Sequence, residues 1–229
     1  MTDSPHKVLL LFDIDGTLLR INNQKNHHIL ARALKACGID SEPIYRQRFA
    51  GRTDRDIFLS VPGATDERFD CIRNHYEQLI ESELTPENIE IIPGVRSTLE
   101  FLSQHGYALG LITGNCRKAA FTKLEKANLD HYFTIGGFGD DHRDRNHLPE
   151  IARVNAAEHF GIPFSPKATL VIGDTPNDIR CARFDTCHSI AVATGSYSAS
   201  ELSAHNPGLL LKTLENPRTW LNEYLRTFT

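Results

Sequence analysis

The sequence contains no long apolar run and little sulfur, with 1 Met and 5 Cys among its 229 residues. No run approaches the ~18 apolar residues that span a bilayer, so we expect no membrane contact. The run at 8–12 is too short for a secretory leader, and an aspartate follows it at once. The cysteines are odd in number and form no CxxC pair, so we expect reduced thiols in a cytoplasmic protein. They are Cys37, Cys71, Cys116, Cys181 and Cys187.

The sequence also lacks an excess of positive charge, because 25 Lys and Arg residues face 29 Asp and Glu residues. A formal net charge of −4 argues against a nucleic-acid partner or an anionic membrane surface. No glycine-rich segment ends in the Gly-Lys-Ser or Gly-Lys-Thr of a nucleotide P-loop. With 40% hydrophobic and 24% charged residues, the composition is that of a folded globular protein.

The hydrophobic pattern predicts a doubly wound, parallel-sheet (Rossmann-like) α/β core. A nearly continuous apolar run at 7–12 is typical of a strand that is buried on both faces. From about residue 90, strands and helices alternate, which favours parallel pairing. The expected strands are 107–112, 132–135, 168–172, 188–193 and 208–211, and the expected helices lie near 95–105, 117–127, 148–160, 177–184, 199–204 and 216–227.

Residues 20–88 show a different pattern, with helical spacing at 24–37 and 66–84 and no convincing strand. This all-helical block follows the first strand of the core directly. We therefore predict a helical cap at 20–89, inserted into a core that consists of 1–19 and 90–229.

Two acidic clusters each follow a predicted buried strand. Asp13 and Asp15 come directly after the first strand, and at i and i+2 of an extended segment their side chains point the same way. Asp174 and Asp178 follow the strand at 168–172 and open a helix. In open α/β sheets, ligands bind at the carboxyl ends of the strands. Adjacent carboxylates need a neutralising cation, and carboxylate oxygens suit Mg²⁺, so the pattern predicts one shared magnesium site.

A third polar turn, Thr113-Gly114-Asn115, lies between the two clusters and again joins a strand to a helix. A hydroxyl group, a glycine and the free N–H groups of the following helix can form a small anion cradle. The tripeptide is by itself a weak signal. Together with the acidic clusters it favours phosphate binding.

This ordered set of motifs resembles the haloacid dehalogenase-like (HAD) superfamily over nearly the whole chain. Asp13-Ile14-Asp15-Gly16-Thr17 is similar to the first motif of that family, Ile112–Asn115 to the second and Gly173–Asp178 to the fourth. Gly51-Arg52-Thr53-Asp54 is similar to the substrate loop in the helical cap of phosphoglycolate-phosphatase-like members.

The resemblance implies a role for each matching residue. Asp13 would be the nucleophile and Asp15 the acid and base. Magnesium would lie between the Asp13 carboxylate, the Asp15 backbone carbonyl and Asp174, with Asp178 in a supporting position. Thr113 would hold the phosphate. The substrate-binding residues would be Thr17, Gly114, Asn115 and Arg52.

The third motif departs from the family pattern, because no lysine occurs between Lys126 and Lys167. An arginine would have to supply that positive charge. We expect Arg145, which lies just before the helix at 148–160, with Arg143 and Arg153 as the alternatives. A solvated mixed-charge loop without a catalytic role is the remaining interpretation.

These expectations define a Mg²⁺-dependent phosphatase that hydrolyses a small phosphorylated metabolite through an aspartyl-phosphate. A phosphosugar mutase of the β-phosphoglucomutase type would use the same residues and is the main alternative. A 2-haloacid dehalogenase fits less well, since it needs neither Mg²⁺ nor an acid at Asp15. A non-enzymatic phospho-accepting signalling module would not explain the helical insertion. The sequence does not indicate an oligomeric state.

Overall fold

The structure, a computed structural model, describes residues 8–228. Expectations that concern the start of the chain, including the lack of a leader, fall partly on residues 1–7 and so lie outside the described residues. Across 8–228, no helix combines the length and the apolar character that crossing a membrane requires.

The core is a parallel sheet in which β1 (Leu9–Phe12) occupies a central position. The strand order is β5-β4-β1-β6-β7-β8. The predicted α/β doubly wound fold is therefore confirmed. The other strands of this sheet are β4 (Ala108–Ile112), β5 (Gly136–Gly137), β6 (Thr169–Gly173), β7 (His188–Val192) and β8 (Leu209–Leu211).

The alternation of side chains along β1 divides the core into two layers. Leu10 and Phe12 lie on one face of the sheet, where they pack against helices α4 (Val95–Gln104), α5 (Arg117–Lys126) and α9 (Pro217–Phe228). Leu9 and Leu11 pack on the opposite face with α6 (Leu148–Phe160) and α7 (Pro176–Phe184). A short helix, α8 (Ala199–Ser203), lies against β8.

One predicted strand is wrong in position, because β5 is Gly136–Gly137 and not 132–135. Phe133 and Ile135 of the predicted segment are buried, with Phe133 in the hydrophobic core. The strand itself consists of glycines because a Cβ on Gly136 would lie 2.7 Å from the Leu111 carbonyl oxygen, and one on Gly137 2.3 Å from that of Leu148. Two glycines show no alternation of apolar and polar residues, so the sequence pattern does not reveal this strand.

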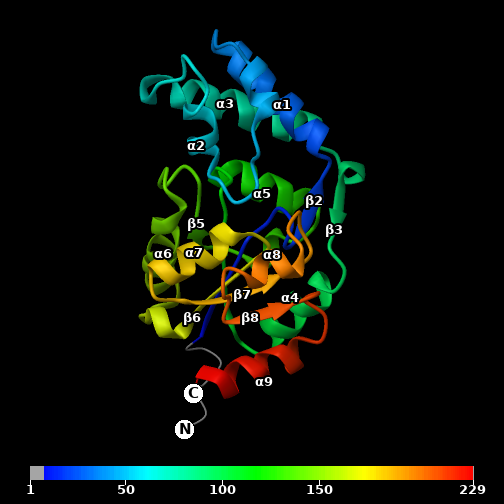
Figure 1. Ribbon diagram of the computed structural model, residues 1–229, viewed down its shortest axis with the longest axis vertical. Helices are drawn as coiled ribbons and strands as arrows, with labels where there is room; N and C mark the ends of the chain where they lie inside the picture. Colours follow the sequence, from blue (N-terminus) through cyan, green and yellow to red (C-terminus); the bar gives the residue numbers. More distant parts are fainter. Residues whose placement is uncertain (1–7, 229) are drawn as a thin grey trace.

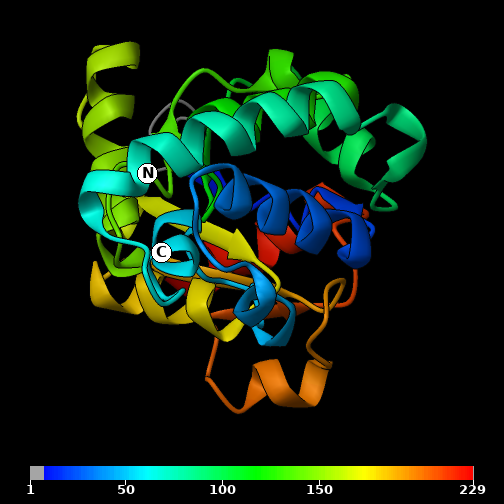
Figure 2. The same ribbon diagram turned by 90° about the horizontal axis from the view of Figure 1, so that it is seen from above.

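Residues 20–89, called the cap below, form a helical layer above the carboxyl ends of the strands (Figure 1). Their boundaries stay a prediction. The helices α1 (Asn23–Ala36) and α3 (Asp66–Glu83) lie side by side (Figure 2) and share a hydrophobic cluster with α2 (Asp54–Leu59). Two 3₁₀ helices, η2 (Glu42–Arg46) and η3 (Pro86–Asn88), complete this layer.

A short antiparallel pair lies where the chain enters and leaves the cap. Strand β2 (Leu19–Ile21) pairs with β3 (Ile89–Ile91), and neither strand was expected from the sequence. Three residues are too few for a periodic pattern. The pair ties the entry and exit of the cap together, close to Asp15.

The expectation of reduced thiols is wrong for two of the cysteines, because Cys37 and Cys71 form a disulfide. Cys37 ends α1 and Cys71 lies in α3, and the packing of these helices brings the two Cα atoms to 6.2 Å, a distance that suits a disulfide. They are 34 residues apart in the sequence, so no local motif reveals the pair. Cys116, Cys181 and Cys187 are free and buried.

Candidate active site

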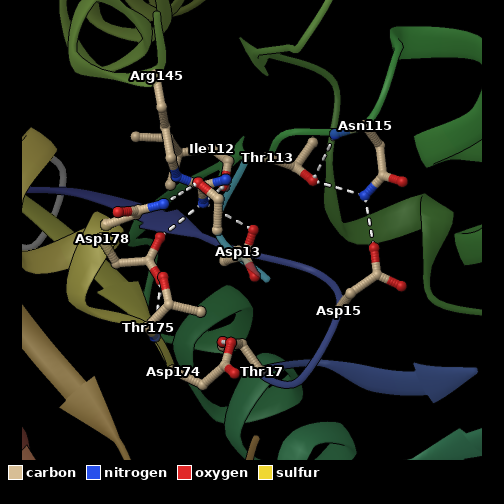
Figure 3. Close-up of polar contacts among 12 residues, drawn as sticks. Asp13, Asp15, Thr17, Ile112, Thr113, Asn115, Arg145, Asp174, Thr175 and Asp178 are labelled. Carbon is tan, nitrogen blue, oxygen red and sulfur yellow. Dashed lines mark hydrogen bonds and ion pairs between the residues drawn. The ribbon is translucent and has the colours of Figure 1, made fainter. Parts of the chain in front are cut away.

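The three predicted motifs meet at one edge of the sheet because their strands are neighbours. Asp13 follows β1, Thr113 follows β4 and Asp174 follows β6, and the strand order places β1 between the other two. A pocket of about 660 Å³ opens at this edge, and its walls come from both the core and the cap. Figure 3 shows the polar side chains that meet there.

Asp13 is buried and held by Arg145. The Nη2 atom of Arg145 lies 2.8 Å from Asp13 Oδ1, 2.6 Å from Asp178 Oδ1 and 3.2 Å from the Ile112 carbonyl oxygen. The side chains of Arg145 and Asp13 are only 5% and 8% exposed. The guanidinium group therefore links the first and fourth motifs directly (Figure 3).

The structure distinguishes the three candidate arginines. Arg145 belongs to the 3₁₀ helix η5 (Arg145–His147), just before α6, and it alone of the three reaches Asp13. Arg143 is half exposed and pairs with Asp56 of the cap. Arg153 forms a two-point ion pair with Asp185.

Asp178 has a structural role at the start of α7. Its Oδ2 atom accepts hydrogen bonds from the backbone N–H and the hydroxyl group of Thr175, which completes a capping box. Its Oδ1 atom accepts the bond from Arg145. Asp178 does not line the pocket, and both of its oxygen atoms already have donors.

Asp174 lies in a space that two glycines keep open. A Cβ on Gly195 would lie 1.6 Å from Asp174 Oδ2, and one on Gly16 2.3 Å from the same atom. Thr17 is fully buried and donates a hydrogen bond to Asp174 Oδ1 at 3.1 Å. Thr17 therefore supports the carboxylate and, unlike Gly114, Asn115 and Arg52, is not part of the pocket wall.

The carboxylates fit a divalent cation. Oxygen atoms of Asp13, Asp174 and Asp178 all lie within 4.8 Å of one another, and all three residues are buried. Hard carboxylate oxygens with little exposure are the donor set that Mg²⁺ accepts. One guanidinium group faces three carboxylates here, so the cluster carries excess negative charge.

Burial and the neighbouring charges shift the pKa values of the cluster. Burial raises the pKa of Asp13 to about 7, although Arg145 acts in the opposite direction. Burial and the neighbouring Asp13 and Asp178 hold the pKa of Asp174 well above its ordinary value. Burial lowers the pKa of Arg145, but Asp178 and Asp13 outweigh this effect and keep it well above its ordinary value. A bound cation would favour the ionised carboxylates.

Asp15 lies apart from this cluster and has its own cation, which the sequence interpretation missed. The Lys123 Nζ atom lies 3.0 and 2.8 Å from the two carboxylate oxygens of Asp15 and 2.6 Å from Asn115 Oδ1. One feature of the sequence could have indicated it: at helical spacing, Lys123 falls on the same face of α5 as the buried residues Ala119, Ala120 and Leu124. A lysine is rarely fully buried unless it is paired.

The turn after β4 is built from the expected residues. Thr113 is fully buried, and its Oγ1 atom accepts hydrogen bonds from the backbone N–H and the side-chain Nδ2 of Asn115. Asn115 Nδ2 also donates to Asp15 Oδ2 at 2.6 Å (Figure 3). The turn therefore connects Thr113 with Asp15.

The cap loop 51–54 packs directly on this turn. The Asp54 backbone N–H donates to the Gly114 carbonyl oxygen at 2.6 Å, and a Cβ on Gly114 would lie 1.9 Å from the Arg52 carbonyl oxygen. The Asp54 carboxylate accepts a bond from the Cys116 N–H at 2.8 Å. Arg52 lines the pocket, but its guanidinium group pairs with Asp56 at 2.7 Å.

Comparison with known proteins is consistent with this geometry. A profile of the family described as haloacid dehalogenase-like hydrolase matches residues 10–192. A phosphoglycolate phosphatase of Agrobacterium fabrum is 29% identical over 210 residues, which cover 85% of this chain and 84% of the relative. The fold and the family match define a hydrolase of the doubly wound α/β class. The chain belongs to the haloacid dehalogenase-like hydrolases.

Solved structures show the same fold at low identity. A predicted phosphatase from Clostridium acetobutylicum superposes with a TM-score of 0.71 at 20% identity and covers 95% of this chain and 99% of its own. A predicted phosphoglycolate phosphatase from Haemophilus somnus has a TM-score of 0.65 at 20% identity, with 96% and 99% covered. The alignments to the first curated relatives, in contrast, span only 52 and 60% of the length of those relatives.

Proposed function

We propose that this protein is a Mg²⁺-dependent phosphatase that hydrolyses a small phosphomonoester through an aspartyl-phosphate. The observation that carries the proposal is the buried contact of Arg145 with both Asp13 and Asp178, next to Asp174, at the base of a pocket that the cap covers. The related proteins that carry the name phosphoglycolate phosphatase support the same class of activity.

In the first half-reaction, a carboxylate oxygen of Asp13 attacks the phosphorus atom of the substrate. The bond between phosphorus and the ester oxygen breaks, and Asp15 gives its proton to the leaving oxygen. Arg145 holds Asp13 at 2.8 Å and remains charged, so it offsets negative charge where the phosphoryl group arrives. The covalent intermediate divides one high barrier into two lower ones.

In the second half-reaction, Asp15 takes a proton from a water molecule. The water oxygen forms a bond to phosphorus, and the bond between phosphorus and Asp13 breaks, which releases phosphate. Asp15 is suited to both transfers because its side chain is 40% exposed, whereas that of Asp13, which also lines the pocket, is only 8% exposed. The cap loop against Gly114 would exclude bulk water during the first transfer.

The metal would be held by the carboxylates of Asp13 and Asp174 and by the backbone carbonyl of Asp15. Asp178 would support the site through Arg145, consistent with the donors that occupy its two oxygen atoms. When bound, Mg²⁺ supplies positive charge to the phosphoryl oxygens and to the attacking carboxylate. The negative charges of Asp13, Asp174 and Asp178 would then be nearly balanced by Mg²⁺ and Arg145.

The substrate we propose is a small phosphorylated metabolite, with Thr113, Gly114 and Asn115 beside its phosphate and Arg52 on the cap side of the pocket. The cytoplasmic location stays a prediction, and the Cys37–Cys71 disulfide removes one of the observations on which it rested. We retain the prediction that neither nucleic acid nor a membrane is a partner.

A screen of phosphorylated metabolites and aryl phosphates for phosphate release, with and without Mg²⁺, tests the proposal. We expect steady release with at least one compound, and loss of release when Asp13 is replaced by Asn.

Transfer of the phosphoryl group back to a phosphosugar without steady release would instead identify a mutase. Turnover of a haloacid without Mg²⁺ would identify a dehalogenase. Stable phosphorylation without turnover would identify a phospho-accepting module.

A further inference from the structure

Lys123 is a fully buried cation that the proposed mechanism does not use. Its side chain is 1% exposed, and it lies in the middle of α5 with its ammonium group directed at the candidate site. Three acceptors surround Nζ: both oxygens of Asp15 and Oδ1 of Asn115. An ammonium group has three N–H donors, so each donor of Lys123 has one acceptor.

The contacts of Lys123 determine how the Asp15 carboxylate is oriented. Asp15 is 40% exposed, and a carboxylate that is open to water on one side can turn freely about its side-chain bonds. Here Lys123 binds both of its oxygens, and Asn115 Nδ2 donates to Oδ2 from a second direction. Asn115 itself is held by Thr113. Contacts from two directions therefore define the plane of the Asp15 carboxylate.

The surroundings of Lys123 also contain a second carboxylate, which comes from the cap. Asp54 is buried beside the N-terminus of α5, where its carboxylate accepts the Cys116 N–H. Burial raises the pKa of Asp54, and the positive charge of Lys123 acts in the opposite direction. The charge of Lys123 therefore interacts with Asp15 of the core and with Asp54 of the cap. Such an arrangement compensates for the cost of removing an ammonium group from water.

We propose that Lys123 is the positioning residue of Asp15: it holds the Asp15 carboxyl group in the orientation in which the proton reaches the leaving oxygen. This inference rests on the proposed phosphatase function and extends it to a residue outside the matched motifs. The hydrogen bonds of Lys123 go to Asp15 and Asn115, and none goes to Asp13. It acts through Asp15.

The test compares two substrates that differ in how much they need a proton on the leaving oxygen. Phenyl phosphate releases a poor leaving group and depends on Asp15 as an acid, whereas 4-nitrophenyl phosphate releases a stable phenolate. The measured quantity is kcat/KM, because it reports the steps up to the transfer of the phosphoryl group to Asp13 and not the later hydrolysis of the aspartyl-phosphate. General acid catalysis contributes about 100-fold or more where it operates.

We expect Lys123→Met to lower kcat/KM about 100-fold for phenyl phosphate and about threefold or less for 4-nitrophenyl phosphate, as loss of a general acid predicts. Asp15→Asn should show the same selective loss. In the double variant, Lys123→Met should add less than about a factor of two to the effect of Asp15→Asn, since residues that act through one group are not additive. Lys123→Arg, which keeps the charge, should recover part of the activity toward phenyl phosphate.

Lys118→Met is the matched control, because Lys118 lies on the same helix but is 52% exposed and pairs with Glu81. It should change neither substrate by more than about twofold, as expected for a surface ion pair. Circular dichroism and thermal melting establish that each variant is folded. If Lys123→Met does not fold, the same ratio of the two substrates is measured with Lys123→Gln and Lys123→Arg.

The two proposals fail in different ways. If the wild type releases phosphate from no compound of the screen, or if Asp15→Asn shows no preference between the two aryl phosphates, the proposed mechanism is wrong and so is the role of Lys123. If Asp15→Asn is selective but folded Lys123 variants slow both substrates equally, Lys123 is only structural. Additive losses in the double variant would equally overturn the inference while leaving the phosphatase function intact.

Discussion

Two aspartates of one motif are held by two different cations, and the difference between their surroundings separates their proposed roles. Asp13 meets Arg145 in a sealed contact, with side chains 8% and 5% exposed. Asp15 meets Lys123, which is 1% exposed, but is itself 40% exposed to the pocket. A nucleophile benefits from a fixed, desolvated position, whereas an acid and base must exchange protons with substrate and water. Residues two positions apart in the sequence thus have environments suited to different steps.

The two cations also come from different kinds of structure. Arg145 lies in a short 3₁₀ helix in the loop that follows β5, and it reaches across to Asp13 and Asp178. Lys123 projects from the middle of α5, eight residues after Asn115. The first cation is the arginine predicted to supply the charge of the family lysine. The second lies where a sequence interpretation expects an apolar residue.

The largest expected effect follows from replacing Asp13, the proposed nucleophile. Asp13→Asn should lower kcat by more than about 1000-fold, because an amide cannot form the covalent intermediate. Asp15→Asn should lower it less, by about 100-fold or more, since it removes proton transfer but not the nucleophile. Phosphate release by purified, folded variants provides the measurement. Equal residual activity in the two variants would contradict the separate roles.

Next in size is the loss of the cation at Asp13. Arg145→Ala should lower kcat by about 100-fold to 1000-fold, the range for removal of one charge-stabilising donor, and Arg145→Lys should restore only part of it. It should also lower the melting temperature, because it leaves buried carboxylates unpaired. Arg153→Ala is the control: its partner is Asp185, so kcat should change little. Inactive Arg153→Ala with active Arg145→Ala would reverse the assignment.

Removal of the metal should stop the reaction while leaving both ion pairs in place. Activity should disappear in EDTA and return when Mg²⁺ is added in excess. Asp174→Ala should raise the Mg²⁺ concentration for half-maximal activity about tenfold or more, because the metal loses a carboxylate ligand. Calorimetric titration with Mg²⁺ measures the same loss without substrate. Full activity in EDTA would exclude the metal site.

The last prediction concerns stability and not activity, and it involves Asp54, a buried carboxylate of the cap. Burial raises the pKa of Asp54 to about 7 from an ordinary value of 3.8, so the folded protein binds this proton more tightly than the unfolded chain. The associated stability is present below pH 3.8 and is lost as the pH rises to about 7. The loss is at most about 1.4 kcal/mol per pH unit in that window.

Asp54→Asn does not titrate, and its side-chain oxygen can still accept the Cys116 N–H. Its stability relative to the wild type should therefore increase between pH 5 and pH 7 and level off above, as measured by urea unfolding at a series of pH values. A difference between the two proteins that stays constant with pH would show that Asp54 ionises normally. Asp56→Asn, which changes a more exposed carboxylate of the same helix, is the control.

The motifs and the order of the elements were predictable because they depend on local pattern. Apolar strands followed by acidic turns identified Asp13 and Asp174 as strand-end residues, and the alternation with helices predicted the parallel sheet that brings these ends together. The place of Arg145 before α6 was predictable in the same way. Physical rules for strand ends and helix starts are short-range, so the sequence alone is enough to apply them.

Other features depended on contacts between distant segments. The Cys37–Cys71 disulfide, the glycine strand β5 and the β2–β3 pair require knowledge of which helices and strands pack together. The predicted roles of Arg52 and Thr17 likewise depend on their partners, Asp56 and Asp174, which no spacing rule indicates.

The sequence by itself determined the fold class and the acidic strand ends, because each follows from residue type and position within one element. Only the tertiary structure decided which arginine reaches Asp13, that Lys123 is buried against Asp15 and Asn115, and that its charge also acts on Asp54 of the cap. A buried charge is tolerated only where opposite charges surround it, and those charges come from segments about 70 and 110 residues away in the chain. Their meeting is a property of the folded chain and not of any local motif.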